Sequence, residues 1–220
     1  MRGIGIAASV LIGLVAALGI ADAIVSQRTA DVVRAYADGN ATMEDARAVD
    51  ALAVMVAIPA LLVNIAAGVT FIVWIYRSRR NAERLTYAVE HRHGRGWVIG
   101  SWITPIVGWW FPYQIVQDIW RSFEPAQQDR PLQARDKNGF ILAWWLGFLL
   151  MSWGDRLVMR LVLREDADLD TVATWTWVTT VVTVVAAAMA VALVKRLTDL
   201  QDRTRPQEFS GPVQVHVPGA

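Results

Sequence analysis

The sequence contains no cysteine and only two lysines, Lys137 and Lys195, among its 21 basic residues. The missing cysteines exclude disulfides, thiolate metal sites and cysteine nucleophiles together. Gly-rich phosphate loops and the motifs G-x-S-x-G and His-Glu-x-x-His, which mark common enzyme classes, are also missing. The net charge of +1 favours no nucleic-acid partner. We therefore expect no catalytic residue, no cofactor and no metal site, and we do not expect an enzyme.

Long hydrophobic runs are what the sequence does have. Hydrophobic residues make up 55% of the chain, and apolar runs cover residues 3–21, 51–76 and 171–194, with a shorter run at 140–154. About 20 consecutive apolar residues are enough to cross the hydrocarbon core as a helix. Apolar spans that alternate with charged loops are typical of a polytopic helical membrane protein. We interpret the first run as a retained helix, because it is longer than the roughly 7–15-residue core of a signal peptide.

The predicted fold class is all-α, with four transmembrane helices and one Pro/Gly-broken segment at 97–120 that is either re-entrant or interfacial. Gly39 and Asn40 predict the end of the first helix, and Thr42 with Asp45 predicts a capping box that starts the second. Beyond Leu200 the residues are polar and without a period, which predicts disorder. The predicted organisation is a membrane domain of residues 1–197, with spans at about 3–21, 51–76, 139–156 and 171–194, and a disordered cytoplasmic tail at 198–220.

The broken segment decides the topology. If residues 97–120 enter and return on one side, 15 basic residues lie on the cytoplasmic side and six outside, whereas a crossing gives ten and 11. Cytoplasmic loops are enriched in Lys and Arg, so the returning topology is favoured, with both termini cytoplasmic. Broken backbone at membrane depth is tolerated only against protein or a water-filled cavity. The candidate packing or cavity residues are Asn64, Trp102, Pro105, Trp109, Pro112, Gln114, Asp118 and Trp120.

The densest charge cluster follows the second span and consists of Arg77, Arg79, Arg80 and Arg84. These arginines are candidate contacts for anionic lipid headgroups, each worth about 1 kcal/mol near the surface, and they also fit a plain topology anchor. Glu90, His91 and His93 follow closely, but one carboxylate and two histidines lack the remaining ligands of a metal site. We therefore expect these three residues in a solvated loop.

Two further polar features lie within or beside the spans. Asn64 is the only strongly polar side chain inside the second span, and we expect it to hydrogen-bond to another helix, with substrate contact as the alternative. Asp155, Arg156 and Arg160 follow the apolar part of the third full span. We expect them to anchor the helix at the interface by extending to the headgroups, with a proton or ion role as the alternative.

Three stretches carry a family resemblance: "YRSRRNAERL", "GRGWVIGSWITPIVGWWFPYQIVQDIWRSFEP" and "AWWLGFLL". Together they resemble an uncharacterised actinobacterial membrane family, catalogued as domain of unknown function 4328, over residues 50 to 195. The sequence departs from the family pattern at Gly94-Arg95, where Ser-Pro is common. The resemblance implies membrane location and no known activity. The residues that carry the family motifs are Arg77 or Arg79-Arg80 with Asn81, Gly96-Trp97, Trp102 to Pro105, Pro112-Tyr113 and Asp118 to Arg121.

Two functions from different classes remain open. The leading hypothesis is a non-enzymatic protein of the bacterial cytoplasmic membrane that assembles with itself or with other membrane proteins, using the Trp-rich segment as a packing element. The alternative is an oligomeric small-solute or ion pathway in which residues 97–120 line a cavity. A lipid-modifying enzyme comes third. Membrane lipids are expected partners in each case.

Overall fold

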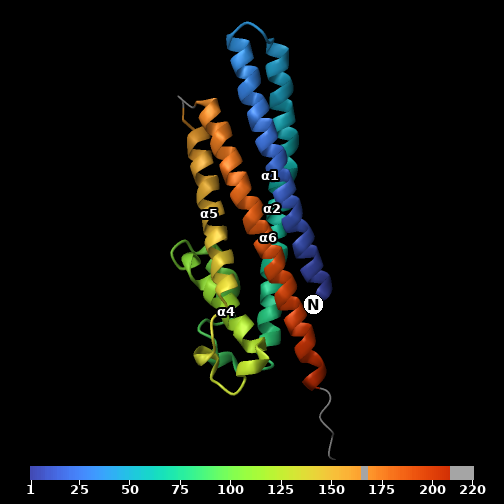
Figure 1. Ribbon diagram of the computed structural model, residues 1–220, viewed down its shortest axis with the longest axis vertical. Coiled ribbons are helices and arrows are strands. Elements are labelled where there is room, and N and C mark those ends of the chain that lie inside the picture. The colour runs from blue at the N-terminus through green and yellow to red at the C-terminus, as the bar shows by residue number, and fades with distance from the viewer. Residues whose placement is uncertain (165–167, 209–220) are drawn as a thin grey trace, which may run out of the picture.

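The computed structural model describes residues 1–164 and 168–208, and this part of the chain is all-α (Figure 1). Four of its helices are long and apolar enough to cross a membrane, which confirms the predicted all-α polytopic membrane protein. They are α1 (Arg2–Ala37), α2 (Met43–Ala82), α5 (Gly139–Val162) and α6 (Leu169–Glu208). Between α2 and α5 lie η1 (Ala88–Glu90), α3 (Trp97–Ile103), η2 (Val107–Trp109), α4 (Phe111–Phe123), η3 (Pro125–Gln127) and η4 (Leu132–Ala134).

The turn between α1 and α2 forms as the sequence predicts. Gly39 follows the end of α1 with a φ of 74°, a conformation that glycine adopts without steric cost. The Thr42 hydroxyl accepts from the Asp45 amide at 3.2 Å, and the Asp45 carboxylate accepts from the Thr42 amide at 2.8 Å. This capping box is confirmed, and it supplies partners for amides that a helix start leaves free. Pro112 likewise lies in the first turn of α4, as predicted.

The end of α6 differs from the sequence prediction. The disordered tail predicted from residue 198 is wrong over 198–208, because these residues continue α6 as far as Glu208. Gln201 is 1% exposed and donates to the Ser78 hydroxyl at 3.1 Å, while its side-chain oxygen accepts from Asn81 at 3.1 Å. These contacts with α2 hold the extension in place, and residues 209–220 of the predicted tail lie outside the described residues.

Helix α6 runs through the middle of the bundle, between α5 on one side and α1 with α2 on the other (Figure 1). In the most apolar 18-residue stretch of each helix, 39% of the stretch is buried in α6, compared with 6% in α2. Helix α1 is antiparallel to α6, since Arg2 pairs with Asp202 at 2.6 Å and the Thr180 hydroxyl donates to the Gly19 carbonyl at 3.3 Å. Other long helices therefore pack around α6.

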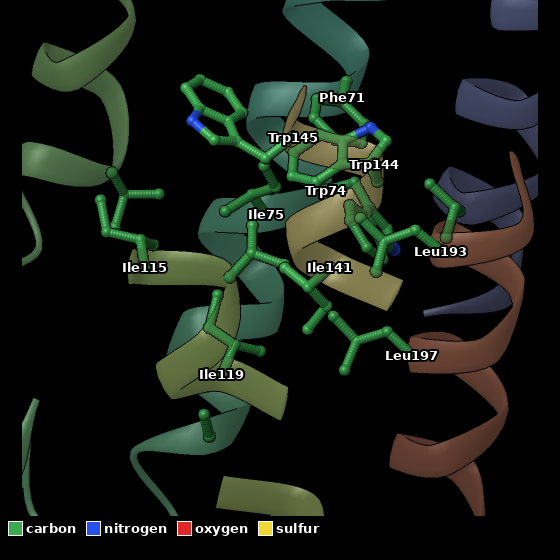
Figure 2. Close-up of a cluster of buried hydrophobic side chains, with 14 of the residues drawn as sticks. Phe71, Trp74, Ile75, Ile115, Ile119, Ile141, Trp144, Trp145, Leu193 and Leu197 are labelled. Atoms are coloured by element: carbon green, nitrogen blue, oxygen red, sulfur yellow. The ribbon is translucent and has the colours of Figure 1, made fainter. Parts of the chain in front are cut away.

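A hydrophobic core cluster lies at the end of the bundle where α4 packs. Figure 2 shows side chains of α2, α4, α5 and α6 meeting there. Trp74 is fully buried and donates from its indole nitrogen to the Thr198 hydroxyl at 3.2 Å, which joins α2 to α6. The labelled members are Phe71, Trp74, Ile75, Ile115, Ile119, Ile141, Trp144, Trp145, Leu193 and Leu197.

Candidate functional site

The broken segment folds into a short helical hairpin made of α3, η2 and α4. Figure 1 places α4, the N-terminus and the end of α6 at one end of the bundle, opposite the α1–α2 turn. The chain thus enters and leaves the hairpin at this end of the bundle. The hairpin turn is tight, because a Cβ added to Gly108 would lie 2.9 Å from the carbonyl oxygen of Ser101. A larger residue would force the two backbones apart.

Aromatic contacts hold the hairpin between α2 and α5. The ring of Trp102 lies edge-on to Phe71 of α2, with centroids 5.9 Å apart, and edge-on to Phe148 of α5 at 5.7 Å. The indole nitrogen of Trp145 donates to the Trp109 carbonyl at 2.8 Å, and the rings of Trp109 and Trp153 meet at 5.4 Å. Edge-to-face pairs of this kind add about 0.5–1.5 kcal/mol beyond area burial. The Trp-rich segment packs within its own chain.

The polar face of α4 is enclosed by the loops on either side of it. Asp118 is fully buried, and its carboxylate accepts from the backbone amide of Arg92 at 3.0 Å and from the guanidinium at 2.7 Å. Gln117 donates to the Asn138 carbonyl at 2.6 Å and accepts from the Asn138 amide at 3.0 Å. Both α4 side chains therefore join the loops to the hairpin, because a buried carboxylate or amide needs such partners.

Gln114 and the neighbouring histidines add further contacts between α4 and the loop that precedes α3. Gln114 bonds to a ring nitrogen of His93 at 2.6 Å, and the His93 ring stacks on Phe111 with centroids 3.7 Å apart. His91 is buried rather than solvated, which corrects the prediction for this loop: it lies 3.0 Å from the Thr86 hydroxyl. Among the described residues no group of metal-binding side chains forms.

The pKa of His91 is lowered to about 4 by its burial and by the positive charge of Arg79, against the opposing effect of nearby carboxylates. The ring is therefore neutral at neutral pH. Arg79 is itself 1% exposed and donates to Glu83 at 2.9 Å, and Glu83 also pairs with Arg95. Within the described residues the Arg79 Nη1 and His91 Nδ1 atoms have no hydrogen-bond partner.

Burial separates the four arginines after the second span. Arg77, Arg80 and Arg84 are exposed, and their contact with lipid headgroups stays a prediction. For Arg79 that prediction is wrong, because its guanidinium is enclosed by protein and paired with Glu83. Helical periodicity explains the difference: Arg79 and Glu83 lie one turn apart on the face of α2 that meets the loops.

Asn64 lies apart from the other candidates. It is exposed midway along α2 and lines a cavity of about 130 Å³ whose other walls come from α1, α5 and α6. Phe71 and Phe148 line this cavity, but no residue of 97–120 does. Asn64 makes no hydrogen bond within the described part of the chain. The structure thus does not bring Asn64 together with Gln114 and Asp118.

The remaining candidates have modest roles in the geometry. Pro105 is exposed at the turn, Pro112 is buried at the start of α4, and Trp120 is half-buried against the hydrophobic cluster. Sequence reasoning missed the pairing of Asp118 with Arg92 and of Gln117 with Asn138. The polar stripe on α4 was visible in the sequence, but nothing local indicates which loop residue meets it.

Comparison with protein families matches residues 37–201 to the family described as Domain of unknown function (DUF4328). The chain belongs to this family. The match covers α2 to α6 with the hairpin between them, so these elements form the DUF4328 unit. Neither the curated proteins nor the solved structures gave a match to this DUF4328 protein.

Proposed function

We propose that this DUF4328 protein is a non-enzymatic component of the bacterial cytoplasmic membrane that assembles with a second copy of itself through α2. The observation that carries the proposal is the unpartnered side-chain amide of Asn64, exposed midway along an apolar helix. Such an amide offers two donors and an acceptor. Acyl chains satisfy none of them, so an exposed amide at this depth is unfavourable.

A second copy supplies what the acyl chains lack. Two α2 helices packed through this face place one Asn64 amide beside the other, and the two amides can donate to and accept from each other. Interhelical hydrogen bonds of this kind contribute about 0.6 kcal/mol on average in membranes. They set which helices pair and in what register, as a buried Asn does in coiled coils.

Gly68 supports the same face. It lies one turn from Asn64, and a Cβ added to it would touch nothing within 4 Å. The packing of this chain therefore does not require glycine there. Small residues on a transmembrane helix allow a second helix to approach closely. The neighbouring apolar side chains Leu61 and Ile65 are 62% and 57% exposed, which leaves them free to contact the partner helix.

The pathway alternative has weaker support. It requires polar side chains that face a common cavity, yet Gln114 and Asp118 bond to His93 and Arg92 in the closed end of the bundle. The cavity beside Asn64 is lined mostly by apolar side chains. Trp102 and Trp109 contribute to packing within the chain, so the contact between copies is assigned to α2 instead of the Trp-rich segment.

Single cysteines can test the assembly, because the chain has none. With Gly68→Cys, a short bis-maleimide should cross-link two copies in native membranes, and adding Asn64→Leu should lower the cross-linked fraction, by a few-fold in the dimer's association constant. Leu62→Cys is the matched control: it is 62% exposed on the same helix but does not line the cavity. Equal cross-linking at both positions, or none at Gly68→Cys, would contradict the proposal.

Light scattering gives an independent readout of the same interface. In mild detergent the parent protein should be a dimer, Asn64→Leu should shift it toward monomer, and Asn64→Gln should retain it because an amide remains. A monomeric parent, or a dimer unaffected by Asn64→Leu, would rule out this face of α2.

A further inference from the structure

A second groove lies between α5 and α6, near the loop that joins them, and has a volume of about 390 Å³. Its walls are largely apolar: α5 contributes Leu150 and Leu157, and α6 contributes Val178 and Val182. From Leu150 to Arg160 the groove follows α5 for about 15 Å, at about 1.5 Å per residue. That length equals one leaflet of a hydrocarbon core roughly 30 Å thick.

Two arginines stand at the end of this groove nearest the loop. Arg156 and Arg160 both line it and both are exposed. They are one turn apart on α5, so their side chains reach the same region. Arg156 donates to the Ser152 carbonyl at 3.2 Å, and neither arginine has an ion-pair partner within the described residues. Asp155 beside Arg156 is the nearest carboxylate that acts on it, and it makes no direct ion pair with either arginine within the described residues. Two positive charges thus stand at the end of an apolar groove.

Aromatic side chains mark the same level. Trp153 and Trp175 line the groove, one from each helix, and are 47% and 41% exposed. Trp is enriched where a membrane meets water, because its ring is apolar and its N–H is polar. The groove therefore begins at the interface, beside the two arginines, and descends into the leaflet.

We propose that this groove binds an anionic phospholipid, with one acyl chain along the apolar walls and the phosphate on Arg156 and Arg160. A guanidinium donates two parallel hydrogen bonds to phosphate, and two guanidinia can enclose one headgroup. A second transmembrane helix would fill the apolar part of the groove but would leave both charges unpaired. The site is independent of the α2 interface.

Binding can be measured by native mass spectrometry of the purified full-length protein with dioleoylphosphatidylglycerol, and with dioleoylphosphatidylcholine for comparison. The parent should retain the anionic lipid preferentially. Because each arginine contributes about 1 kcal/mol near an anionic headgroup, the double variant Arg156→Gln/Arg160→Gln should bind phosphatidylglycerol at least about tenfold more weakly. Arg28→Gln/Arg47→Gln, which removes one exposed arginine each from α1 and α2, is the matched control and should bind like the parent.

A groove-filling variant separates shape from charge. Val178→Phe keeps both arginines and places a ring in the groove, so it too should lose the bound lipid. Its elution volume in size-exclusion chromatography and its circular-dichroism spectrum should stay those of the parent. The proposal is overturned if the Arg156→Gln/Arg160→Gln variant binds as tightly as the parent, if the Arg28→Gln/Arg47→Gln control loses as much affinity, or if the parent shows no preference for phosphatidylglycerol.

Discussion

The indole nitrogen of Trp145 lies 2.8 Å from the backbone carbonyl oxygen of Trp109, to which it donates a hydrogen bond. Trp145 belongs to α5, and Trp109 ends η2 at the turn of the hairpin. The bond ties the break in the chain to a long helix. Backbone groups freed by a broken helix need partners at membrane depth, and here a side chain supplies one.

Trp145→Phe should therefore destabilise the protein. The change keeps an aromatic ring but removes the donor to the Trp109 carbonyl in a part-buried hydrogen bond, which costs about 0.5–1.5 kcal/mol. The free energy of unfolding by denaturant in detergent micelles would measure it. Trp175→Phe is the control, because Trp175 is 41% exposed on the surface of α6. Equal loss in both variants would mean that the hydrogen bond is not the cause.

Gly154 and Gly147 offer a matched pair at the contact between α5 and α6. A Cβ on Gly154 would lie 2.6 Å from Cγ2 of Thr179, whereas one on Gly147 would lie 3.7 Å from the Cβ of Ala186. Gly154→Ala should force the helices apart and cost about 1–3 kcal/mol, as overpacking does, and Gly147→Ala should be tolerated. Thermal unfolding followed by circular dichroism would compare them, and the reverse order would contradict the packing described.

His91 should make stability depend on pH. Its pKa falls from 6.5 to about 4 in the folded state, so the unfolded chain binds more protons between these values. Stability rises with pH where the unfolded state binds more protons. The contribution of His91 is thus complete above pH 6.5 and is lost as the pH falls toward 4.

The change in melting temperature between pH 7.5 and pH 5 would measure this contribution of His91. His91→Asn should show a smaller decrease than the parent, because Asn does not titrate. His93→Asn serves as the control at the neighbouring histidine and should keep the decrease. An unchanged pH dependence in His91→Asn would show that another group causes it.

The orientation of the chain is testable in intact cells. Gln128 and Asn40 are both exposed, in the loop after the hairpin and in the α1–α2 turn respectively. The distribution of basic residues predicts that Gln128 is cytoplasmic. A membrane-impermeant maleimide should then label Asn40→Cys and leave Gln128→Cys protected until the cells are opened. The opposite pattern would place both termini outside.

Local chemistry made several features predictable. The capping box of Thr42 and Asp45, the position of Pro112 in the first turn of α4, and the four long helices all follow from residues close together in the sequence. The break at Pro105 and Gly108 is local as well, since each residue limits the backbone where it stands. Apolar run length and the distribution of charge predict that the segment returns to the side from which it starts, and this topology stays a prediction.

Burial of individual polar residues was not predictable in this way. Arg79 looks like Arg77 and Arg80 in the sequence, yet it alone of the three is enclosed. The extension of α6 through Gln201 was not predictable from its polar composition either, because hydrogen bonds to α2 outweigh the local helix propensity.

The sequence by itself determined an all-α membrane protein with four long apolar helices and a broken segment between the second and the third, because these features depend on hydropathy, helix caps and breakers within short stretches. Only the tertiary structure decided that Asp118 meets Arg92, that His91 is buried, and that Asn64 is left without a partner. Those outcomes depend on how each helix is rotated and which distant loop covers it. Side-chain packing across the whole chain sets both, and no single stretch encodes either.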